Sequence, residues 1–297
     1  MKKTLWLPLL AGLLLLSGLV LGRAWSVWRE QRAASIPVAT LAGESVENSE
    51  EEVEEVDEEA AQNLALFFGQ DDREFIAEPY PQPFAAIGKL ETRSGSHCTA
   101  TLVAPDLAIT AAHCFLMLPK ELDDGVWFWA GFHEGRWLAR YQVLSQHFDP
   151  RFKQGLDYIG DDVYIQPQIS QFDIAWMKLK RVDGVAPTPI PVFQGNDRQL
   201  IDAMNRHDNR ATQAGYAHDH NQVLTAHRAC KLTGLVEDDT VEHQCDTLSG
   251  DSGSPLFLET ANGPLLIGVQ SAAPDWYDRD KADNIAVTVL NLPKRPK

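Results

Sequence analysis

The stretch Cys245-Asp246-Thr247-Leu248-Ser249-Gly250-Asp251-Ser252-Gly253-Ser254-Pro255 stands just before a short apolar run, residues 256–258. Its centre is a turn of small residues that can hold the Ser252 hydroxyl away from the backbone. Such a turn can also direct the backbone N–H groups of Gly250 and Ser252 into one small space. A nucleophile beside two such donors suits acyl transfer, because negative charge develops on the attacked carbonyl oxygen. The stretch therefore predicts an acyl-transfer site, provided that a base and an orienting carboxylate lie elsewhere in the chain.

Two upstream motifs supply these partners. Thr110-Ala111-Ala112-His113-Cys114 follows a strand-like run, and Phe172-Asp173-Ile174-Ala175-Trp176-Met177-Lys178-Leu179 comes later. With the Gly-Asp-Ser-Gly-Ser-Pro turn, these motifs resemble the chymotrypsin-like serine peptidases, whose triad runs His, Asp, Ser along the chain. The resemblance implies that Ser252 is the nucleophile, His113 the base and Asp173 the carboxylate that orients it. It also implies an oxyanion hole made by the N–H groups of Gly250 and Ser252.

The orienting carboxylate has three rivals in the preceding loop, at Asp157, Asp161 and Asp162. Only Asp173 leads into the strand-like run 174–179, which matches the strand that follows the aspartate in the family. We therefore expect Asp173 to be the triad member.

The residues expected to form the substrate pocket combine features of two different substrate preferences. Asp246 lies six residues before Ser252, at the position whose carboxylate gives trypsin its preference for Lys and Arg. The bacterial branch that contains the glutamyl endopeptidases often has an Asp-Thr pair there, as in Asp246-Thr247. Those enzymes also use a histidine in the strand after the serine, where this chain has Gln270, followed by Ser271. The resemblance implies a pocket built from these four residues, with cleavage after Arg or Lys expected and cleavage after Glu as the alternative.

Asp251 matches an aspartate that, in the animal enzymes, binds a freshly cut N-terminal ammonium and so forms the oxyanion hole. No Arg-Ile-Val-like cleavage site precedes the domain. Cutting after Arg73 would expose Glu74-Phe75, which suits a buried ion pair poorly. The sequence therefore does not support activation by N-terminal cleavage.

Short strand-like runs separated by turn residues fill residues 69–297, the predicted peptidase domain. Residues 98–103 and 107–110 flank a Pro-Asp pair and predict a hairpin that ends near His113. Further runs lie at 126–130, 137–144, 174–179, 190–193, 211–217, 223–226, 255–258, 265–270 and 285–290. This pattern predicts an all-β fold, and the resemblance implies two six-stranded antiparallel β-barrels with the site between them. Only the acidic run and residues 198–206 are compatible with a helix.

The N-terminal residues predict export. Two lysines precede nineteen uncharged, leucine-rich residues, so that residues 1–22 read as a signal peptide or a signal anchor. The apolar run nearly spans a bilayer core and its candidate cleavage site is poor, which favours membrane tethering through residues 4–22. The expected location is periplasmic or secreted, with or without that tether. Residues 23–68 contain the acidic run and predict a disordered linker or a propeptide.

The four cysteines form two close pairs in the sequence and allow three disulfide connectivities. Export favours disulfides over free thiols. The resemblance implies the pairs Cys98–Cys114 and Cys230–Cys245, the first of which would staple the loop that carries the histidine.

Charge narrows the possible partners. The net charge is −16, and residues 44–59 alone contribute −10. Phosphate binding needs clustered Lys and Arg, so we expect no nucleic acid partner. The resemblance implies a protein or peptide substrate and neither a cofactor nor a metal. His218, His220 and His227 could suggest a metal site, but we expect them to be surface residues.

Two other functions share these motifs. A catalytically silent trypsin-fold binding module would need a lost triad residue, and none is lost in the sequence. An esterase-type acyl hydrolase uses the same triad chemistry, but the chain order of the triad differs from that of the α/β-hydrolases.

Overall fold

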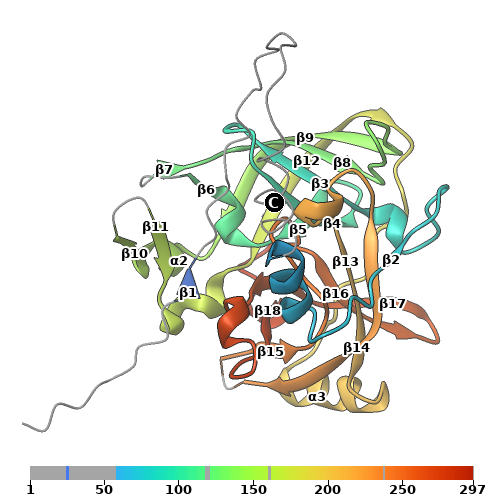
Figure 1. The fold of residues 1–297 in the computed structure, drawn as a ribbon. Helices are drawn as coiled ribbons and strands as arrows, with labels where there is room; N and C mark the ends of the chain where they lie inside the picture. The colour runs from blue at the N-terminus through green and yellow to red at the C-terminus, as the bar shows by residue number, and fades with distance from the viewer. Residues whose placement is uncertain (1–24, 27–57, 118–120, 160–161, 237, 297) are drawn as a thin grey trace, which may run out of the picture.

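The computed structural model describes residues 25–26, 58–117, 121–159, 162–236 and 238–296 (Figure 1). Within those ranges no helix is both long enough and apolar enough to cross a bilayer. The predicted signal peptide or anchor, residues 1–22, lies outside them, as does most of the predicted linker.

Six antiparallel strands close into a first barrel in the order β12-β5-β4-β3-β8-β9. The predicted hairpin is present, with a sharp turn at residues 105–106 between β4 and β5. The strands are β3 (Ile87–Thr92), β4 (His97–Ala104), β5 (Leu107–Thr110), β8 (Gly125–Ala130), β9 (Ala139–Phe148) and β12 (Ala175–Gly184).

A second set of strands runs in the order β13-β16-β17-β18-β15-β14 and closes through a β13–β14 pairing. The expected all-β fold with two six-stranded antiparallel barrels is therefore confirmed. The short strand β2 (Glu74–Phe75) adds to the edge of β14. The barrel strands are β13 (Arg210–Gly215), β14 (Thr225–Leu235), β15 (Thr240–His243), β16 (Pro255–Thr260), β17 (Gly263–Ala272) and β18 (Asn284–Thr288).

The predicted helix over residues 198–206 is α3 (Asp197–Arg206). A capping box between Asn196 and Gln199 satisfies backbone N–H groups at its start. Its apolar face buries Leu200, Ala203 and Met204 against the second barrel. The helix thus covers part of that core.

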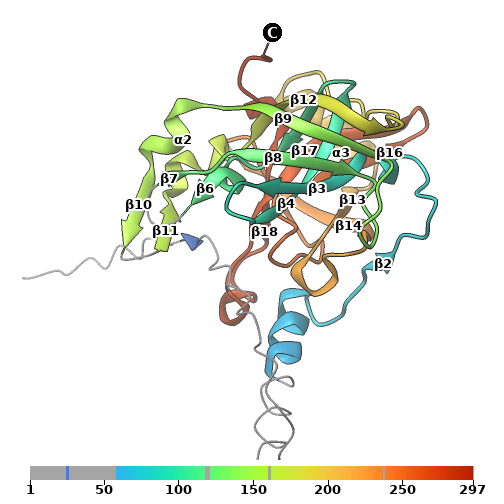
Figure 2. The ribbon, with the colours of Figure 1, turned by 90° about the horizontal axis from the view of Figure 1, so that it is seen from above.

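Short strands and helical segments lie outside the two barrels (Figure 2). A hairpin of β10 (Leu156–Ile159) and β11 (Asp162–Ile165) pairs with β1 (Trp25–Ser26), and β6 (Leu116–Met117) pairs with β7 (Glu121–Leu122). The helical pieces are α2 (Pro150–Gln154), η1 (Phe84–Ala86), η2 (Ala112–Phe115), η3 (Pro167–Phe172), η4 (His218–His220), η5 (Trp276–Asp278) and η6 (Val289–Asn291).

Two expectations about the strands were wrong. The run 190–193 forms only a single bridge between Val192 and Leu266. Strand β15, by contrast, was not predicted, because its residues Thr-Val-Glu-His carry one apolar side chain and give no clear alternation. Its place is set by pairing with β14 and β18 on either side.

The end of the predicted linker also differs from expectation. Residues 58–66 are helical, and Leu66 and Phe67 are buried against Ala217 and Leu248 (Figures 1 and 2, in blue). Burial of these two apolar side chains offsets the conformational entropy that the segment loses when it becomes ordered. The chain therefore contacts the second barrel well before the first strand of the domain.

Gly88 in β3 is a test of barrel packing. A Cβ there would overlap the Trp129 carbonyl group and lie 2.8 Å from Ala130 Cα, both on the backbone of β8. We expect Gly88→Ala to reduce the free energy of unfolding by about 3 kcal/mol or more, because a strand backbone must move. Urea unfolding measures this loss.

Gly234→Ala in β14 is the matched control, since the nearest atom to its Cβ, at 3.8 Å, is the end of the Glu242 side chain. We expect it to change stability by less than about 1 kcal/mol. Equal losses for the two variants would contradict this account of the barrel.

Candidate active site

His113 and Asp173 lie at the same edge of the first barrel. His113 is in η2, directly after β5, and Asp173 directly precedes β12. These two strands are hydrogen-bonded neighbours, with Ala175 opposite Thr110. Sheet pairing therefore brings together two residues that are sixty positions apart in the chain.

The Asp173 carboxylate is fully buried and receives three hydrogen-bond donors. Oδ1 accepts from the His113 backbone N–H at 2.7 Å, and Oδ2 lies 2.6 Å from His113 Nδ1. Ser271 Oγ, from β17 in the second barrel, donates to Oδ2 at 2.5 Å. This network fixes the position of the imidazole and ties the two barrels together.

Asp157, one of the rival carboxylates, accepts from the Gln166 side chain in the β10–β11 region. Asp161 and the side chain of Asp162 lie outside the described part of the chain. Of the two candidates whose side chains the structure describes, Asp173 is the one that bonds to His113.

Ser252 lies on a turn that requires glycine on both sides. Gly250 has φ +92° and Gly253 has φ +78°, a region that favours glycine. A Cβ on Gly250 would lie 2.5 Å from the Tyr216 carbonyl oxygen, and one on Gly253 would overlap Thr110. A side chain on Gly253 would therefore displace the turn from the first barrel, and one on Gly250 would displace it from Tyr216.

The turn packs directly against the segment that carries His113. The Ser252 carbonyl accepts from the Thr99 backbone N–H at 2.9 Å, and Cys114 Sγ lies 3.8 Å from the same oxygen. Thr99 Oγ1 donates to the Gly250 carbonyl at 3.1 Å and accepts from the Tyr216 N–H at 3.0 Å. These bonds orient the peptide groups on either side of the serine.

The expected oxyanion donors have no acceptor in the described part of the chain. Among the residues that the structure describes, no backbone or side-chain acceptor bonds to the N–H of Gly250 or of Ser252. Buried or half-buried N–H groups normally find partners. Two unpaired donors on one short turn are suited to a ligand oxygen.

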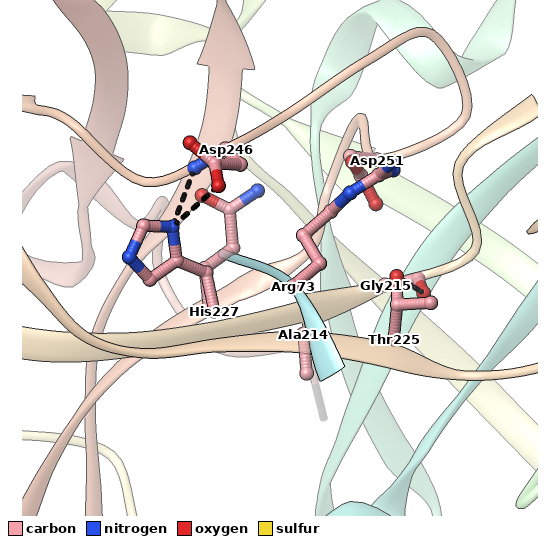
Figure 3. Close-up of a pocket in the computed structure, with 8 residues that line it drawn as sticks. Arg73, Ala214, Gly215, Thr225, His227, Asp246 and Asp251 are labelled. Carbon is pink, nitrogen blue, oxygen red and sulfur yellow. Dashed lines mark hydrogen bonds and ion pairs between the residues drawn. The ribbon is translucent and has the colours of Figure 1, made fainter. Parts of the chain in front are cut away.

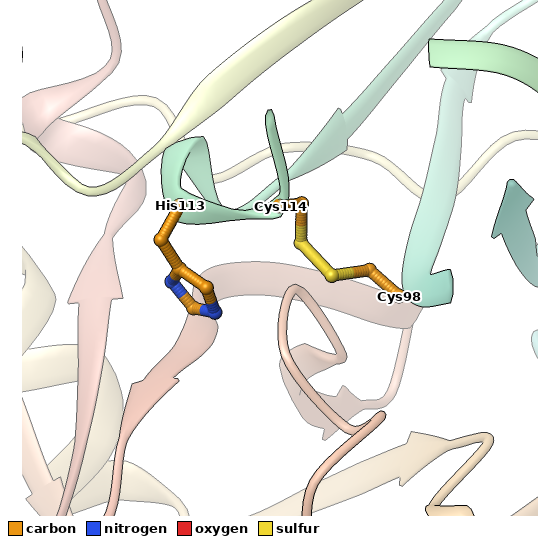
Figure 4. A group of neighbouring side chains, drawn as sticks. All are labelled: Cys98, His113 and Cys114. Atoms are coloured by element: carbon orange, nitrogen blue, oxygen red, sulfur yellow. A yellow bond between two sulfur atoms is a disulfide. The ribbon is translucent and has the colours of Figure 1, made fainter. Parts of the chain in front are cut away.

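Both expected disulfides form. Cys98–Cys114 joins β4 to η2, with Cα atoms 6.1 Å apart, and Cys230–Cys245 joins β14 to the segment before the Ser252 turn, with Cα atoms 4.9 Å apart. Figure 4 shows the first disulfide on the same turn as the His113 imidazole. Each bond therefore anchors a segment that carries an expected catalytic residue.

The expected pocket residues face different partners. Thr247 Oγ1 lies 3.4 Å from Asp251, and Gln270 Nε2 donates to the Ala272 carbonyl at 3.0 Å. Ser271 is engaged with Asp173, as described above. The side chains of Thr247, Gln270 and Ser271 therefore each bond within the protein.

The Asp246 carboxylate is already occupied by the chain. Asp246 is 3% exposed, accepts from the Asp72 backbone N–H at 2.6 Å, and lies 3.1 Å from His227 Nδ1. It lines a recess too narrow to hold a water molecule, together with Arg73 and Asp251 (Figure 3). Asp246, the residue expected to bind a cationic side chain of the substrate, is thus covered by the segment that contains Asp72 and Arg73.

Among the described residues, two groups of side chains bring their donor atoms as close together as metal ligands. In the first, Cys98 and Cys114 form a disulfide and offer no thiolate beside His113. In the second, which also includes Asp72, the Asp246 carboxylate accepts from the Asp72 backbone N–H, and His227 Nδ1 accepts from the Asp246 backbone N–H.

Two of the histidines considered for a metal lie at the surface, as expected. The side chains of His218 and His220 are 40% and 36% exposed and lie near Glu59 and Asp219, respectively. His227 differs, because its side chain is only 12% exposed and lies in the recess with Asp246.

The sequence analysis missed Arg73, although the triplet Asp71-Asp72-Arg73 was a visible signal. Its side chain is only 5% exposed and is paired with Asp71 and Asp219. Burial opposes its charge, but the two carboxylates raise the pKa of Arg73 above its usual value. A buried, fully ionised guanidinium therefore stands next to the Ser252 loop.

Asp251 is a buried carboxyl directly before the serine. Burial raises its pKa to about 7, against hydrogen bonds from Leu248 and Thr247 and the charge of Arg73, which act to lower it. The folded protein thus loses this proton at a higher pH than the unfolded chain does.

This difference predicts a pH-dependent stability. In the unfolded chain Asp251 ionises near pKa 3.8, and in the folded chain near pKa 7. Its favourable contribution is therefore complete below the lower value and is lost as the pH rises to the upper one, by about 1.4 kcal/mol per unit. We expect the stability of Asp251→Asn relative to wild type to increase between pH 4 and pH 7, as measured by urea unfolding. Asp202→Asn, which removes an exposed carboxyl from α3, is the control. A pH-independent difference for Asp251→Asn would show that the group is not held in this way.

Several solved structures are similar to this chain, among them the following three. A Glu endopeptidase in complex with MPD superposes with a TM-score of 0.57 at 19% identity, over 75% of this chain and 94% of that one. The protease Anisep from Arthrobacter nicotinovorans gives 0.48 at 15% identity, over 70% and 91% of the two chains. The thermostable serine protease AL20 from an extremophilic microorganism gives 0.49 at 17% identity, over 70% and 92%.

The sequence model of the family described as Trypsin matches residues 76–290, which include both barrels and all three motifs. This match spans most of the chain, so the protein belongs to the trypsin family of serine endopeptidases.

Proposed function

We propose that this protein hydrolyses peptide bonds through Ser252, His113 and Asp173. The observation that carries the proposal is the buried Asp173 carboxylate, which holds His113 through two hydrogen bonds beside the glycine-flanked Ser252 turn. A carboxylate so placed keeps the imidazole in the tautomer whose Nε2 can accept a proton.

The reaction follows from these roles. The Ser252 hydroxyl attacks the substrate carbonyl while His113 takes its proton, and the imidazolium is stabilised by Asp173. His113 then returns the proton to the leaving amine, and an acyl-enzyme remains. Water, deprotonated by His113, attacks the ester and releases the acid.

The N–H groups of Gly250 and Ser252 are the proposed oxyanion donors. Both are backbone groups, so Ser254, which replaces the last glycine of the animal motif, does not alter them. Each such donor contributes roughly 3 kcal/mol to transition-state binding in related chemistry.

The proposed substrate is a protein or peptide, and the proposed pocket is formed by Asp246, Thr247, Gln270 and Ser271. Cleavage after Arg or Lys stays a prediction, tested by peptides that differ only at the residue before the cut. Because Asp246 is engaged by Asp72 and His227, a cationic side chain would have to share its carboxylate. A preference for Glu in the same peptides would exclude the trypsin-like role of Asp246.

Export supports this assignment and is proposed with it. Two disulfides in one domain are typical of oxidising compartments. Fractionation of cells that express the full chain distinguishes a secreted or periplasmic protein from one tethered by residues 4–22.

Ser252→Ala tests the proposed nucleophile. We expect a fluorophosphonate probe to label the wild type and not the variant, and peptide turnover to fall by several orders of magnitude. Ser145→Ala, on the exposed part of β9, is the control and should be labelled like the wild type. Absence of labelling in the folded wild type would favour a silent binding module, and hydrolysis of esters but not of peptides would favour an esterase.

Ser271→Ala tests the link between the barrels. Loss of one hydrogen bond to a charged acceptor costs roughly 1.5–3 kcal/mol, so we expect kcat to fall about 10- to 100-fold with a smaller change in KM. A kcat equal to that of the wild type would show that Ser271 does not help to position Asp173.

A further inference from the structure

The side chain of Arg73, which is 5% exposed, is held between two carboxylates that are partly exposed, Asp71 and Asp219. Its guanidinium donates to Asp71 through Nε at 2.9 Å and Nη2 at 2.8 Å. It donates to Asp219 through Nη1 at 3.1 Å and Nη2 at 2.6 Å, and its Cζ lies 4.2 Å from the centre of the Phe67 ring. Both contacts are bidentate, which fixes orientation as well as distance.

Asp219 passes this restraint to the Ser252 turn. It lies in η4, where the neighbouring His218 N–H donates to the Ser249 carbonyl at 2.7 Å. The His218 backbone nitrogen would also lie only 3.2 Å from a Cβ atom placed on Gly250, so the two backbones are in close contact. The ion pair is therefore one residue and one hydrogen bond away from the peptide that carries the first oxyanion donor.

Asp251 provides a second connection between Arg73 and the turn. The two side chains line the same narrow recess, and Figure 3 shows the guanidinium directed toward the carboxyl group. Asp251 also accepts from the Leu248 backbone N–H at 3.1 Å. The charge of Arg73 acts against the burial that raises the pKa of Asp251, so the two side chains are coupled electrostatically.

Apolar contacts act on the same two segments. Leu66 and Phe67, which precede Arg73, pack against Ala217 beside η4 and against Leu248 beside the turn. The segment before the barrels thus contacts the surroundings of the Ser252 loop in two ways. Arg73 forms an ion pair with Asp219, and Leu66 and Phe67 pack against apolar side chains.

We propose that Arg73 is a positioning residue that holds the Ser252 loop in its catalytic conformation within the uncut chain. An internal guanidinium would then do what a newly cut N-terminal ammonium does in the animal enzymes. Without it, the carboxylates of Asp71 and Asp219 would remain close together without a cation, and their repulsion would move Asp219 and the loop bonded beside it. The inference rests on the proposed function of Ser252.

Arg73→Met tests this role, because it keeps much of the side-chain volume and removes the charge. We expect kcat to fall about 100-fold, the scale of a misplaced oxyanion donor, with a smaller change in KM. Arg73→Lys should recover part of the loss, since it restores the charge without the bidentate geometry.

Arg228→Met is the matched control. Arg228 lies on the adjacent strand β14 and pairs at the surface with Glu74 and Glu259, so its loss should leave kcat unchanged. Circular dichroism and thermal melting establish that each variant is folded. A folded Arg73→Met variant with the kcat of the wild type would overturn the inference.

Chemical rescue separates positioning from a general loss of stability. Millimolar guanidinium chloride should restore activity to Arg73→Ala, because a free guanidinium can occupy the vacated site between Asp71 and Asp219, whereas sodium chloride at equal ionic strength should not. If the Arg73 variants do not fold, Asp219→Asn decides the matter, because it breaks the same contact while keeping Arg73, and a folded Asp219→Asn variant should show a lowered kcat. No rescue and no effect of Asp219→Asn would overturn the inference. A wild type without turnover or labelling would instead overturn the proposed function.

Discussion

The buried carboxylate of Asp173 is the constraint on which the rest of the site depends. It takes donors from the first barrel through His113 and from the second through Ser271. A buried charge is costly unless its lone pairs are satisfied, and here three donors converge on two oxygens. The two barrels must therefore meet in one relative position for this charge to be tolerated, and that position also sets the geometry around the imidazole.

The turn that carries Ser252 obeys a second constraint. Gly250 and Gly253 adopt positive φ. Thr99 and Thr110 of the first barrel leave no room for a side chain at Gly253, and the Tyr216 carbonyl oxygen leaves none at Gly250. Thr99 also bonds to the carbonyl oxygens of Gly250 and Ser252. The loop is thus shaped by contacts from both barrels, so the proposed nucleophile depends on their interface in the same way as the proposed base does.

A third feature of the site is a group of charged side chains behind the Ser252 turn. The recess behind the turn contains Arg73, Asp246 and Asp251, and the N-terminal segment supplies both the cation and the N–H group that binds Asp246. In a protein with a net charge of −16, this cation is surrounded by carboxylates that would otherwise repel one another. Residues before the barrels are therefore part of the support of the site and not merely a spacer.

The sequence alone determined the all-β class and the hairpin before His113 and allowed a helix at residues 198–206, whereas the two cysteine pairs followed from the resemblance to the chymotrypsin-like peptidases. These features depend on local patterns, turn residues and specific motifs, which are written in neighbouring positions. Only the tertiary structure decided that Ser271 contacts Asp173, that Asp246 is covered by Asp72 and that Arg73 is buried beside Asp251. Each of these contacts joins residues about 100 or more positions apart, and their partners depend on how the two barrels and the N-terminal segment pack, which no local pattern records.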